Sequence, residues 1–376
     1  MEQKRKFNWS SGLFIIGYHL LIIGLLPLYL CHAFPSAGIL LTSLLLLYAT
    51  GLSITGGYHR LFSHSTYKVH KVVEVIYLFF GTMATQGSAL RWAHDHRLHH
   101  AHVDTDKDPY SVKKGFWYAH LFWMFYKQPP IEERIVSDLM RNKLLVFQNK
   151  YYEILMVATN AVVALLIGFI SGDYFGAFLF TWLIRLFFLH HFTWFINSLA
   201  HYWGHQNYST EHSAVDNYLI SMLTFGEGYH NYHHTFAGDY RNGIRWYHFD
   251  PSKWIIWGLS KVGLAHGLKR ANETRISILM IEEHKKALLE KLTHSFTHKK
   301  EEFEAKITLF TESLTNKLSE MQQLVAQYKA SLKDEHAAPQ TLKKDINYLR
   351  KALKREWRAW RHFSKRVMRL KSTMPL

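Results

Sequence analysis

Histidines grouped at short intervals are the residues of this chain that could do chemistry. The 376 residues include 26 histidines, and eight of these fall into three clusters. The clusters are His59-Arg-Leu-Phe-Ser-His64, His96-Arg-Leu-His99-His100 and His230-Asn-Tyr-His233-His234. Neutral imidazole is the commonest metal ligand among protein side chains. Eight imidazoles are too many for one ion but enough for two, so the clusters predict a centre that holds two metal ions.

The spacing within each cluster favours convergence on one point. Residues at i, i+3 and i+4 share one face of a helix, so the second and third clusters can each aim three rings at one region. The five-residue step of the first cluster suits the frayed end of a helix or a less regular turn. The sequence has no matching pair of Glu-x-x-His motifs, which excludes the carboxylate-bridged di-iron site of soluble bundles. Iron, zinc and copper all fit nitrogen-rich ligation, and the residues alone leave these three open.

Four apolar runs flank these clusters in the sequence and must position them. Each is long enough to cross a bilayer, which takes roughly 20 apolar residues. The runs are Leu13 to Leu30, Gly38 to about Gly57, Ile154 to Ile170, and Phe175 to about Ile196. Residues 32–37 and 171–174, between paired runs, contain no lysine or arginine. The long basic stretches therefore share the other side, which the positive-inside rule makes the cytoplasm. We expect an all-α integral membrane fold of two hairpins, with a cytoplasmic histidine-rich helical body and both termini in the cytoplasm.

Several residues in and around these runs carry further expectations. Arg185, His190 and His191 interrupt the fourth run, and ionisable groups at that depth are costly, so we expect them to face the bundle interior or its inner rim. The stretches 72–87 and 254–268 are short or amphipathic, which favours helices that lie along the membrane surface. Cys31 is the single cysteine, which excludes an internal disulfide and a thiolate metal cage. It follows an apolar run, and we expect it to be a small buried residue.

The chain changes character after about residue 270. Apolar residues recur at three-, four- or seven-residue steps from Leu289 to Leu332 and from Ile346 to Leu370, with a break at Ala338-Pro339-Gln340. This pattern predicts two helices with heptad-like seams, most simply a coiled-coil-like antiparallel hairpin or a self-association coil. The second helix is strongly basic, within a chain of formal net charge +16. That helix could lie on anionic lipid headgroups or could simply present a solvated face. Nucleic acid fits the charge alone, but attachment to a membrane argues against it.

The histidine spacings, in this order around two hairpins, resemble those of the membrane fatty acid desaturases, and are most similar to the delta-9 group that acts on acyl-CoA or acyl-lipid. The resemblance is carried by the local sequences Gly57-Tyr58-His59-Arg60-Leu61, Trp92-Ala93-His94-Asp95-His96-Arg97, Gly115-Phe116 and Gly226-Glu227-Gly228-Tyr229-His230-Asn231-Tyr232-His233-His234. It implies a membrane desaturase domain over residues 1–268, and it does not cover the C-terminal helical extension, residues 269–376.

The resemblance also implies roles for individual residues. One iron ion would be held by His59, His64, His96, His100 and His233, and the other by His99, His201, His230 and His234. Asn197 would contribute through a water molecule, and Trp194 would line the acyl tunnel, although an interfacial belt position also suits this tryptophan. Asp95 and Lys127 match headgroup-binding residues of the acyl-CoA enzymes. His94 and Gly87 depart from that pattern, and Gln86-Gly87 is more similar to acyl-lipid members, so both substrates remain open.

Desaturation fits a site of this kind because an unactivated methylene C–H bond is too strong for acid–base side chains, so metal and oxygen must supply the oxidising power. Electrons would come from a separate donor such as cytochrome b5, ferredoxin or a reductase. Two alternatives stay open, namely a lipid hydroxylase with the same site and a non-enzymatic metal-binding membrane scaffold. Metal-bound imidazoles usually donate their other N–H to a carboxylate or carbonyl. The unassigned candidates for this role are Asp95, Asp104, Asp106, Asp108, Glu227 and Asp239.

Overall fold

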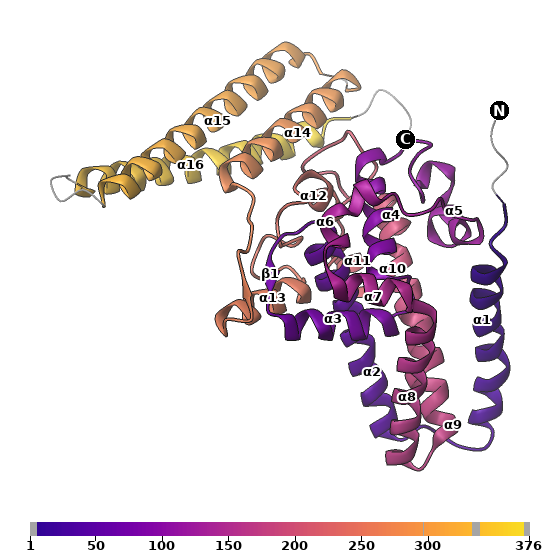
Figure 1. Cartoon of the computed structure of the whole chain (residues 1–376). Coiled ribbons are helices and arrows are strands. Elements are labelled where there is room, and N and C mark those ends of the chain that lie inside the picture. The colour runs from indigo at the N-terminus through magenta and orange to yellow at the C-terminus, as the bar shows by residue number, and fades with distance from the viewer. Residues whose placement is uncertain (1–5, 296, 333–338, 372–376) are drawn as a thin grey trace. The chain divides into compact units, whose positions relative to one another are not determined.

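The computed structural model describes residues 6–295, 297–332 and 339–371, which are mostly helical (Figure 1). Contacts divide the chain into two compact units. The first unit consists of residues 1–205 and 211–270, and the second consists of residues 206–210 and 271–376. The two-stranded sheet lies in the first unit, where β1 (Lys68–Val69) pairs antiparallel with β2 (Ala265–His266).

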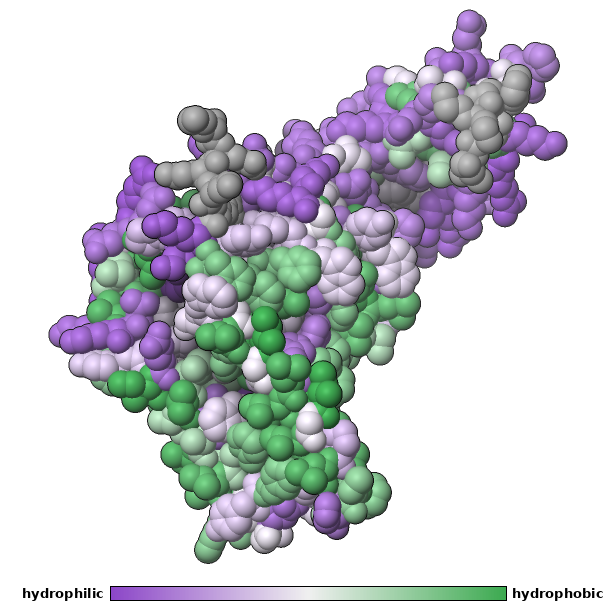
Figure 2. All heavy atoms as spheres, turned by 90° about the vertical axis from the view of Figure 1, so that its right-hand side faces the viewer, coloured by the Kyte–Doolittle hydropathy of each residue, from purple (hydrophilic) through white to green (hydrophobic). Residues whose placement is uncertain are grey.

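Four helices of the first unit are long and apolar enough to cross a membrane, which confirms the four predicted spans. The first is α1 (Trp9–Leu30) and the third is α8 (Tyr152–Ser171). The second joins α2 (Ala37–Leu52) to the π-helix η1 (Ser53–Ser63), and the fourth joins α9 (Tyr174–Ala177), the π-helix η5 (Phe178–Ile184), α10 (Arg185–Asn197) and η6 (Leu199–His201). Large apolar side chains point outward along them, and Figure 2 shows such residues gathered on the lower part of the face in view. The fold is an all-α integral membrane fold.

The polar residues of the fourth span face the interior, as predicted. Arg185 is buried, and its guanidinium donates to the carbonyl oxygens of Thr181 at 2.9 Å and Met83 at 3.1 Å, and to the side chain of Asn160. His190 is also buried, with its Nε2 atom 3.1 Å from the carbonyl oxygen of Ala84. These contacts satisfy groups that would otherwise be costly inside a bilayer.

Short helices form the body that carries the histidine clusters. Among them, α3 runs across the direction of α2 and α8 in Figure 1 and exposes Val72, Ile76 and Phe79 on its outer side. Its position along a membrane surface remains a prediction. The short helices of this body are α3 (Lys71–Met83), α4 (Ala89–His102), η2 (Val112–Lys114), α5 (Phe116–His120), η3 (Phe122–Phe125), η4 (Glu133–Val136), α6 (Ser137–Met140), α7 (Lys143–Lys150), α11 (Tyr218–Leu223), α12 (His230–Thr235) and α13 (Pro251–Lys261).

Glycines let η1 and α3 approach closely. A Cβ atom at Gly57 would lie 2.9 Å from Cβ of Tyr77, and a Cβ atom at Gly81 would meet the ring of Tyr58. Tyr58 is fully buried in the core that η1, α4 and α7 share, and its hydroxyl accepts a hydrogen bond from Gln148 at 2.7 Å. This packing fixes the segment that carries the first histidine cluster.

The expectation for Cys31 is wrong, because the residue is exposed. It lies directly after α1, where the chain turns towards α2. The apolar run before Cys31 is the helix α1, whose own outer side chains are exposed. A position next to an apolar run therefore did not imply burial.

The described residues of the second unit form three helices, α14 (Glu273–Thr293), α15 (Lys300–Ser331) and α16 (Pro339–Met368). The predicted hairpin is present as α15 and α16, and α14 packs with them as a third helix, which the prediction did not separate. Pro339 begins α16, a position that proline favours, while Phe296 and Ala338 lie outside the described residues. The three helices share one core, formed by Ile281, Leu288, Leu292, Phe303, Ile307, Leu314, Leu318, Leu349, Leu353, Trp360 and Val367.

Candidate metal centre

Four segments of the first unit deliver the nine predicted histidines to one place. The π-helix η1 explains the five-residue step of the first cluster, because i to i+5 hydrogen bonding places such residues one turn apart. The backbone N–H of His64 donates to the carbonyl oxygen of His59 at 3.2 Å in this pattern. The second cluster lies on α4, the third lies on α12, and His201 ends η6.

The first group of histidines is His59, His64, His96, His100 and His233. Each offers one ring nitrogen, and these nitrogens all lie within 4.8 Å of one another. The Nε2 atom of His233 lies 2.9 Å from Nε2 of His59 and 2.9 Å from Nε2 of His100. Nε2 of His64 lies 2.8 Å from Nε2 of His96. The rings therefore meet through the same nitrogen, as ligands of one ion would.

The second group is His99, His201, His230 and His234, and its ring nitrogens lie within the same 4.8 Å limit. Nε2 of His230 lies 3.0 Å from Nε2 of His201 and 3.1 Å from Nε2 of His234. Nε2 of His99 lies 3.3 Å from Nε2 of His234. The two groups have the same membership as the two ligand sets that the family resemblance implied.

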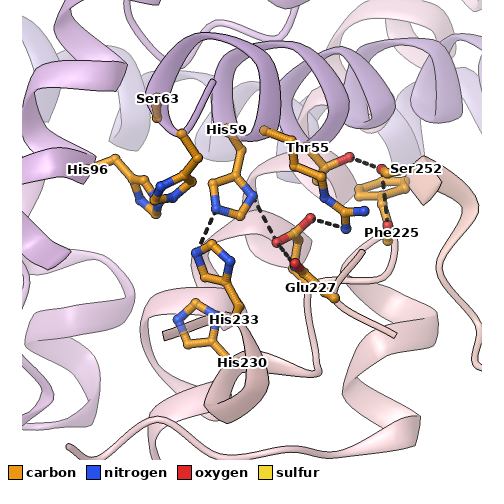
Figure 3. Close-up of polar contacts among 12 residues, drawn as sticks. Thr55, His59, Ser63, His96, Phe225, Glu227, His230, His233 and Ser252 are labelled. Atoms are coloured by element: carbon orange, nitrogen blue, oxygen red, sulfur yellow. Dashed lines mark hydrogen bonds and ion pairs between the residues drawn. The ribbon is translucent and has the colours of Figure 1, made fainter. Parts of the chain in front are cut away.

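The opposite ring nitrogen, Nδ1, is held by acceptors in at least three of these histidines. Nδ1 of His59 donates to Glu227 at 2.9 Å, and Nδ1 of His99 donates to Asp108 at 2.9 Å. Figure 3 shows His59 between Glu227 on one side and His233 on the other. His201 donates to the hydroxyl of Ser213 at 2.8 Å, and that hydroxyl donates in turn to Asp104 at 2.6 Å.

These contacts decide where the ring protons are. A neutral imidazole that donates from Nδ1 holds no proton on Nε2, so in their neutral forms His59, His99 and His201 direct Nε2 lone pairs at other rings of their groups. An Nε2 lone pair in this position can bind a metal ion.

Six of the other rings have lowered pKa values. Burial, and then the charge of neighbouring groups, lowers the pKa of the rings of His64, His96 and His100 well below the usual 6.5. The same causes lower the pKa values of three rings on α12, those of His230, His233 and His234. Uncharged rings keep a lone pair for a metal ion.

The donor set therefore fits metal ions. Neutral, buried imidazoles with free Nε2 atoms are the form in which histidine binds metals, and carboxylates on Nδ1 are the usual outer partners. Five rings in one group and four in the other can surround two ions. Nitrogen donors alone do not choose among iron, copper and zinc.

A buried ion-pair network holds Glu227. Arg60 donates to Glu227 at 2.8 Å and to Asp250 at 2.9 Å, and Asn242 donates to Glu227 at 2.6 Å. Although burial alone would raise the pKa of Glu227, the nearby His59 and Arg60 lower it to about 2. The carboxylate thus stays ionised where it holds the first histidine.

The six acidic residues that were candidates for outer partners of the histidines differ in what they contact. Glu227 and Asp108 contact histidines of the two groups directly, and Asp104 does so through Ser213. Asp95 instead accepts from Arg91 and His94, while Asp239 accepts from Arg241 and Tyr232. The backbone carbonyl of Asp106 accepts from Lys114. Ser213, Arg60 and Asn242 were missed from the sequence, because only the fold brings them to the clusters.

A cavity of about 530 Å³ borders both groups of histidines. His59 and His96 of the first group and His99 and His230 of the second line it. Trp194 and Asn197 line it as well, as do Asp95 and Lys127, so each of the other predicted site residues borders this one space. Lys127 is exposed, which marks a place where the cavity reaches solvent. Its lining combines polar and charged groups with apolar and aromatic side chains such as Ile15, Ile54 and Trp194.

Trp194 is buried and held by rings. The imidazoles of His120, His190 and His191 lie with centroids 5.8, 5.0 and 5.0 Å from its ring. Beside it, the hydroxyl of Thr193 accepts a hydrogen bond from Gln86 at 2.8 Å. Thr193 and Gln86 both line the cavity, so this part of its wall has a defined geometry.

Comparisons with known proteins agree with this arrangement. The family model described as fatty acid desaturase matches residues 36–265. The chain is 39% identical over 292 residues to acyl-CoA desaturase 1 of Saccharomyces cerevisiae, which covers 76% of this chain and 56% of that protein. It is 39% identical over 288 residues to a probable acyl-CoA desaturase of Schizosaccharomyces pombe, covering 76% and 59% of the two chains. This chain thus spans less than two thirds of either yeast protein.

A shorter relative is matched almost completely. The sn-1 stearoyl-lipid 9-desaturase of Anabaena variabilis is 33% identical over 272 residues, which covers 72% of this chain and 97% of that protein. The matched family region, residues 36–265, contains all nine histidines of the two groups.

Proposed function

The chain belongs to the fatty acid desaturase family, and from that premise we propose that it is a membrane fatty acyl desaturase. The reaction would insert a cis double bond, of the delta-9 type, into an acyl-CoA chain with the use of O2. We place this activity in residues 1–268, with residues 269–376 as an extension. The active site and both termini would face the cytoplasm, because the connections without basic residues lie on the other side.

The observation that supports the proposal most is the direction of the ring nitrogens. Three histidines use Nδ1 for hydrogen bonds to Glu227, Asp108 and Ser213. Their Nε2 atoms therefore face the other rings of the two groups. The groups also border a cavity lined by Trp194 and by buried apolar residues. Metal ligands and a place for an alkyl chain thus meet at one point.

We propose that both metal ions are iron. His59, His64, His96, His100 and His233 would hold one ion, and His99, His201, His230 and His234 would hold the other, with Asn197 contributing through a water. Bound iron would supply the activation that lets O2 remove hydrogen from an unactivated methylene. The carboxylates of Glu227 and Asp108 would keep two of these rings in the orientation and tautomer that leave Nε2 free.

The cavity residues would bind and orient the acyl chain. Ile15, Ile54 and Trp194 are buried and line the cavity, so an alkyl chain there would be removed from water. Such burial contributes roughly 0.8 kcal/mol for each methylene. The hydrogen bond from Gln86 to Thr193 would fix the wall beside Trp194 and so help to select the bond that lies next to the metal centre.

The reaction also fixes what must come from other molecules. The substrate loses two hydrogens and O2 becomes two waters, so two electrons and two protons must enter in each turnover. The electrons would come from a separate donor such as cytochrome b5, ferredoxin or a reductase.

Expression in a host whose own desaturase is deleted tests the proposal. We expect new monounsaturated fatty acids from the native chain and none from His233→Ala, whose ring belongs to the first group. A matched control is His102→Ala, because His102 lies on α4 but in neither group. Hydroxylated lipids in place of unsaturated ones would favour the hydroxylase alternative. An unchanged lipid profile, with the protein present and iron-loaded, would contradict the proposal and leave the scaffold alternative.

An acyl-lipid substrate is the second candidate. The Anabaena relative is a stearoyl-lipid desaturase by its name, and Gln86-Gly87 resembles that group. Against it, Lys127 and Arg91 border the cavity and could meet the phosphates of acyl-CoA. Supplying the purified, iron-loaded protein and a reductant with either stearoyl-CoA or a stearoyl phospholipid would distinguish the two.

A further inference from the structure

Helix α16 of the second unit has one strongly basic face. Eleven basic side chains, ten on α16 and that of Arg369 directly after its last residue, fall within about 160° of arc when successive residues are 100° apart. All eleven are exposed, and we call them the basic face. The basic face consists of Lys343, Lys344, Arg350, Lys351, Lys354, Arg355, Arg358, Arg361, Lys365, Arg366 and Arg369.

The basic face has little countercharge within the second unit. The two carboxylates of α16, on Asp345 and Glu356, lie outside the arc, and Glu356 is paired with Lys317 of α15 at 2.7 Å. Among the described residues, no side chain of the basic face forms an ion pair. Arg366 instead lies over the ring of Phe303, 5.5 Å from its centroid. The charge is therefore available to an anionic partner.

The opposite side of α16 packs into the core of the second unit, which leaves the basic face exposed. Ile346, Leu349, Leu353, Trp360 and Val367 are buried on that side, and most of them belong to the core that α16 shares with α14 and α15. Trp360 is fully buried, so α16 cannot rotate about its axis without exposing a large apolar ring. The bundle thus presents the basic charges along a helix about 45 Å long.

We propose that the basic face binds the anionic headgroups of a lipid bilayer. A long row of flexible basic side chains suits a surface that carries many mobile negative charges, and each Lys or Arg near such a surface strengthens binding roughly fivefold. Exposed Tyr348 and Met368 border the face and can enter the headgroup region, where amphipathic and apolar side chains are stable.

Attachment of the second unit to four membrane spans favours lipid over other polyanions. The polypeptide chain tethers the second unit to the four spans, which raises the effective concentration of headgroups around the basic face. Nucleic acid or an acidic protein would have to compete with that surface. The proposal does not depend on desaturation, because it uses no residue of the metal centre.

A label within the basic face tests the contact in the full chain. Cys31→Ser removes the single cysteine, and Asn347→Cys, an exposed position within the arc, then carries an environment-sensitive dye. The protein is placed in nanodiscs of phosphatidylcholine, or of equal parts phosphatidylcholine and phosphatidylserine, with a nitroxide on some headgroups. We expect quenching in the discs with phosphatidylserine, reversal by high salt, and little quenching with phosphatidylcholine alone.

Charge variants make the result specific to the basic face. Arg355→Gln, Arg358→Gln and Lys365→Gln together should lower the ratio of bound to free helix roughly a hundredfold. The matched control neutralises three lysines of α14 and α15, with Lys285→Gln, Lys291→Gln and Lys329→Gln, and should leave the quenching unchanged. Circular dichroism shows whether each variant keeps its helices.

Three outcomes would overturn the proposal. Equal quenching in both kinds of disc would mean that charge is not what the face recognises. No quenching in either disc, with the helices intact, would mean that the face stays in solvent. A dye response to duplex DNA or to polyglutamate in neutral discs, without a response to phosphatidylserine, would identify a soluble polyanion as the partner.

Discussion

An oxygen of Glu227 lies 2.9 Å from Nδ1 of His59, and this contact sets which nitrogen of the ring faces the other histidines. The carboxylate can only accept, so the ring donates from Nδ1, and in the neutral form of the ring Nε2 then carries no hydrogen. Glu227 is itself held by Arg60 and Asn242, and Arg60 is held by Asp250. A network that reaches beyond the histidines therefore prepares one of them for a metal ion.

Replacing Glu227 tests this relationship. In Glu227→Gln the side-chain amide can donate to Nδ1 of His59, which would place the ring hydrogen on Nε2 and remove the lone pair from the centre. We expect a loss of roughly 10- to 100-fold in metal affinity, as is typical when an outer partner of a metal-bound histidine is changed. Iron content under chelator competition measures it, with the exposed Glu132→Gln as control. Equal affinity in the two variants would contradict the role of Glu227.

Lys127 tests which headgroup the cavity accepts. If acyl-CoA is the substrate, Lys127→Gln should raise KM a few-fold and leave kcat unchanged, because an exposed ion pair contributes about 1 kcal/mol or less. If the substrate is an acyl-lipid without extra phosphates, KM should not change. Lys150→Gln, an exposed lysine that does not line the cavity, is the control. A fall in kcat with constant KM would place Lys127 in a different role.

The close approach of Tyr77 to Gly57 predicts that a larger residue at position 57 lowers the stability of the fold. Gly57→Ala would place Cβ 2.9 Å from Cβ of Tyr77, and overpacking of this kind costs about 1–3 kcal/mol. Because η1 carries His59, the same variant should also bind less iron. Gly258→Ala, inside α13, meets no atom within 4 Å and should be neutral or stabilising. Thermal unfolding in detergent compares the two variants, and equal midpoints would show that η1 and α3 can move apart cheaply.

The lowered pKa of His248 predicts how the free energy of unfolding varies with pH. Burial, followed by the charges of Lys253 and Arg245, lowers the pKa of His248 to about 4 from 6.5, against a smaller opposing effect of Asp250. The unfolded chain therefore binds a proton near pH 6.5 that the folded chain takes up only near pH 4. The free energy of unfolding should fall as the pH drops through that window.

A difference between variants isolates this contribution. His248→Gln should show a smaller loss of stability between pH 6.5 and pH 4 than the native chain does. His266→Gln changes an exposed histidine of β2 and should follow the native profile. If all three profiles coincide, the ring of His248, which stacks on Tyr229 with centroids 4.7 Å apart, is not the group that titrates.

Local spacing accounts for what the sequence could predict about the site. The i, i+3, i+4 patterns on α4 and α12 are set by helix geometry, so their convergence could be inferred from residue order alone. His201 stands alone in the sequence, and only the family resemblance joined it to the second group. The spans were equally accessible, because a run of about 20 apolar residues is typical of a helix that crosses a bilayer.

The parts that escaped prediction depend on distant contacts or on small backbone differences. Six carboxylates were candidates for the outer partners, and the choice of Glu227 and Asp108 depends on loops that only tertiary structure brings to the rings. The π-helix η1 could not be distinguished from a frayed turn by its composition. The separate helix α14 was hidden because apolar steps continue from Leu289 and Leu292 into the next helix without a strong breaker.

Each group of histidines draws on both halves of the chain, and this has a consequence for biogenesis. His59, His64, His96 and His100 precede the third span, whereas their partner His233 follows the fourth. The partners of His99 in the second group, His201, His230 and His234, are likewise synthesised about a hundred residues later or more. A nascent chain therefore has no complete metal site until translation has passed His234 and both hairpins are in the bilayer. Loading of the proposed metal ions must therefore follow insertion, and a chain released from the ribosome earlier would lack the complete site.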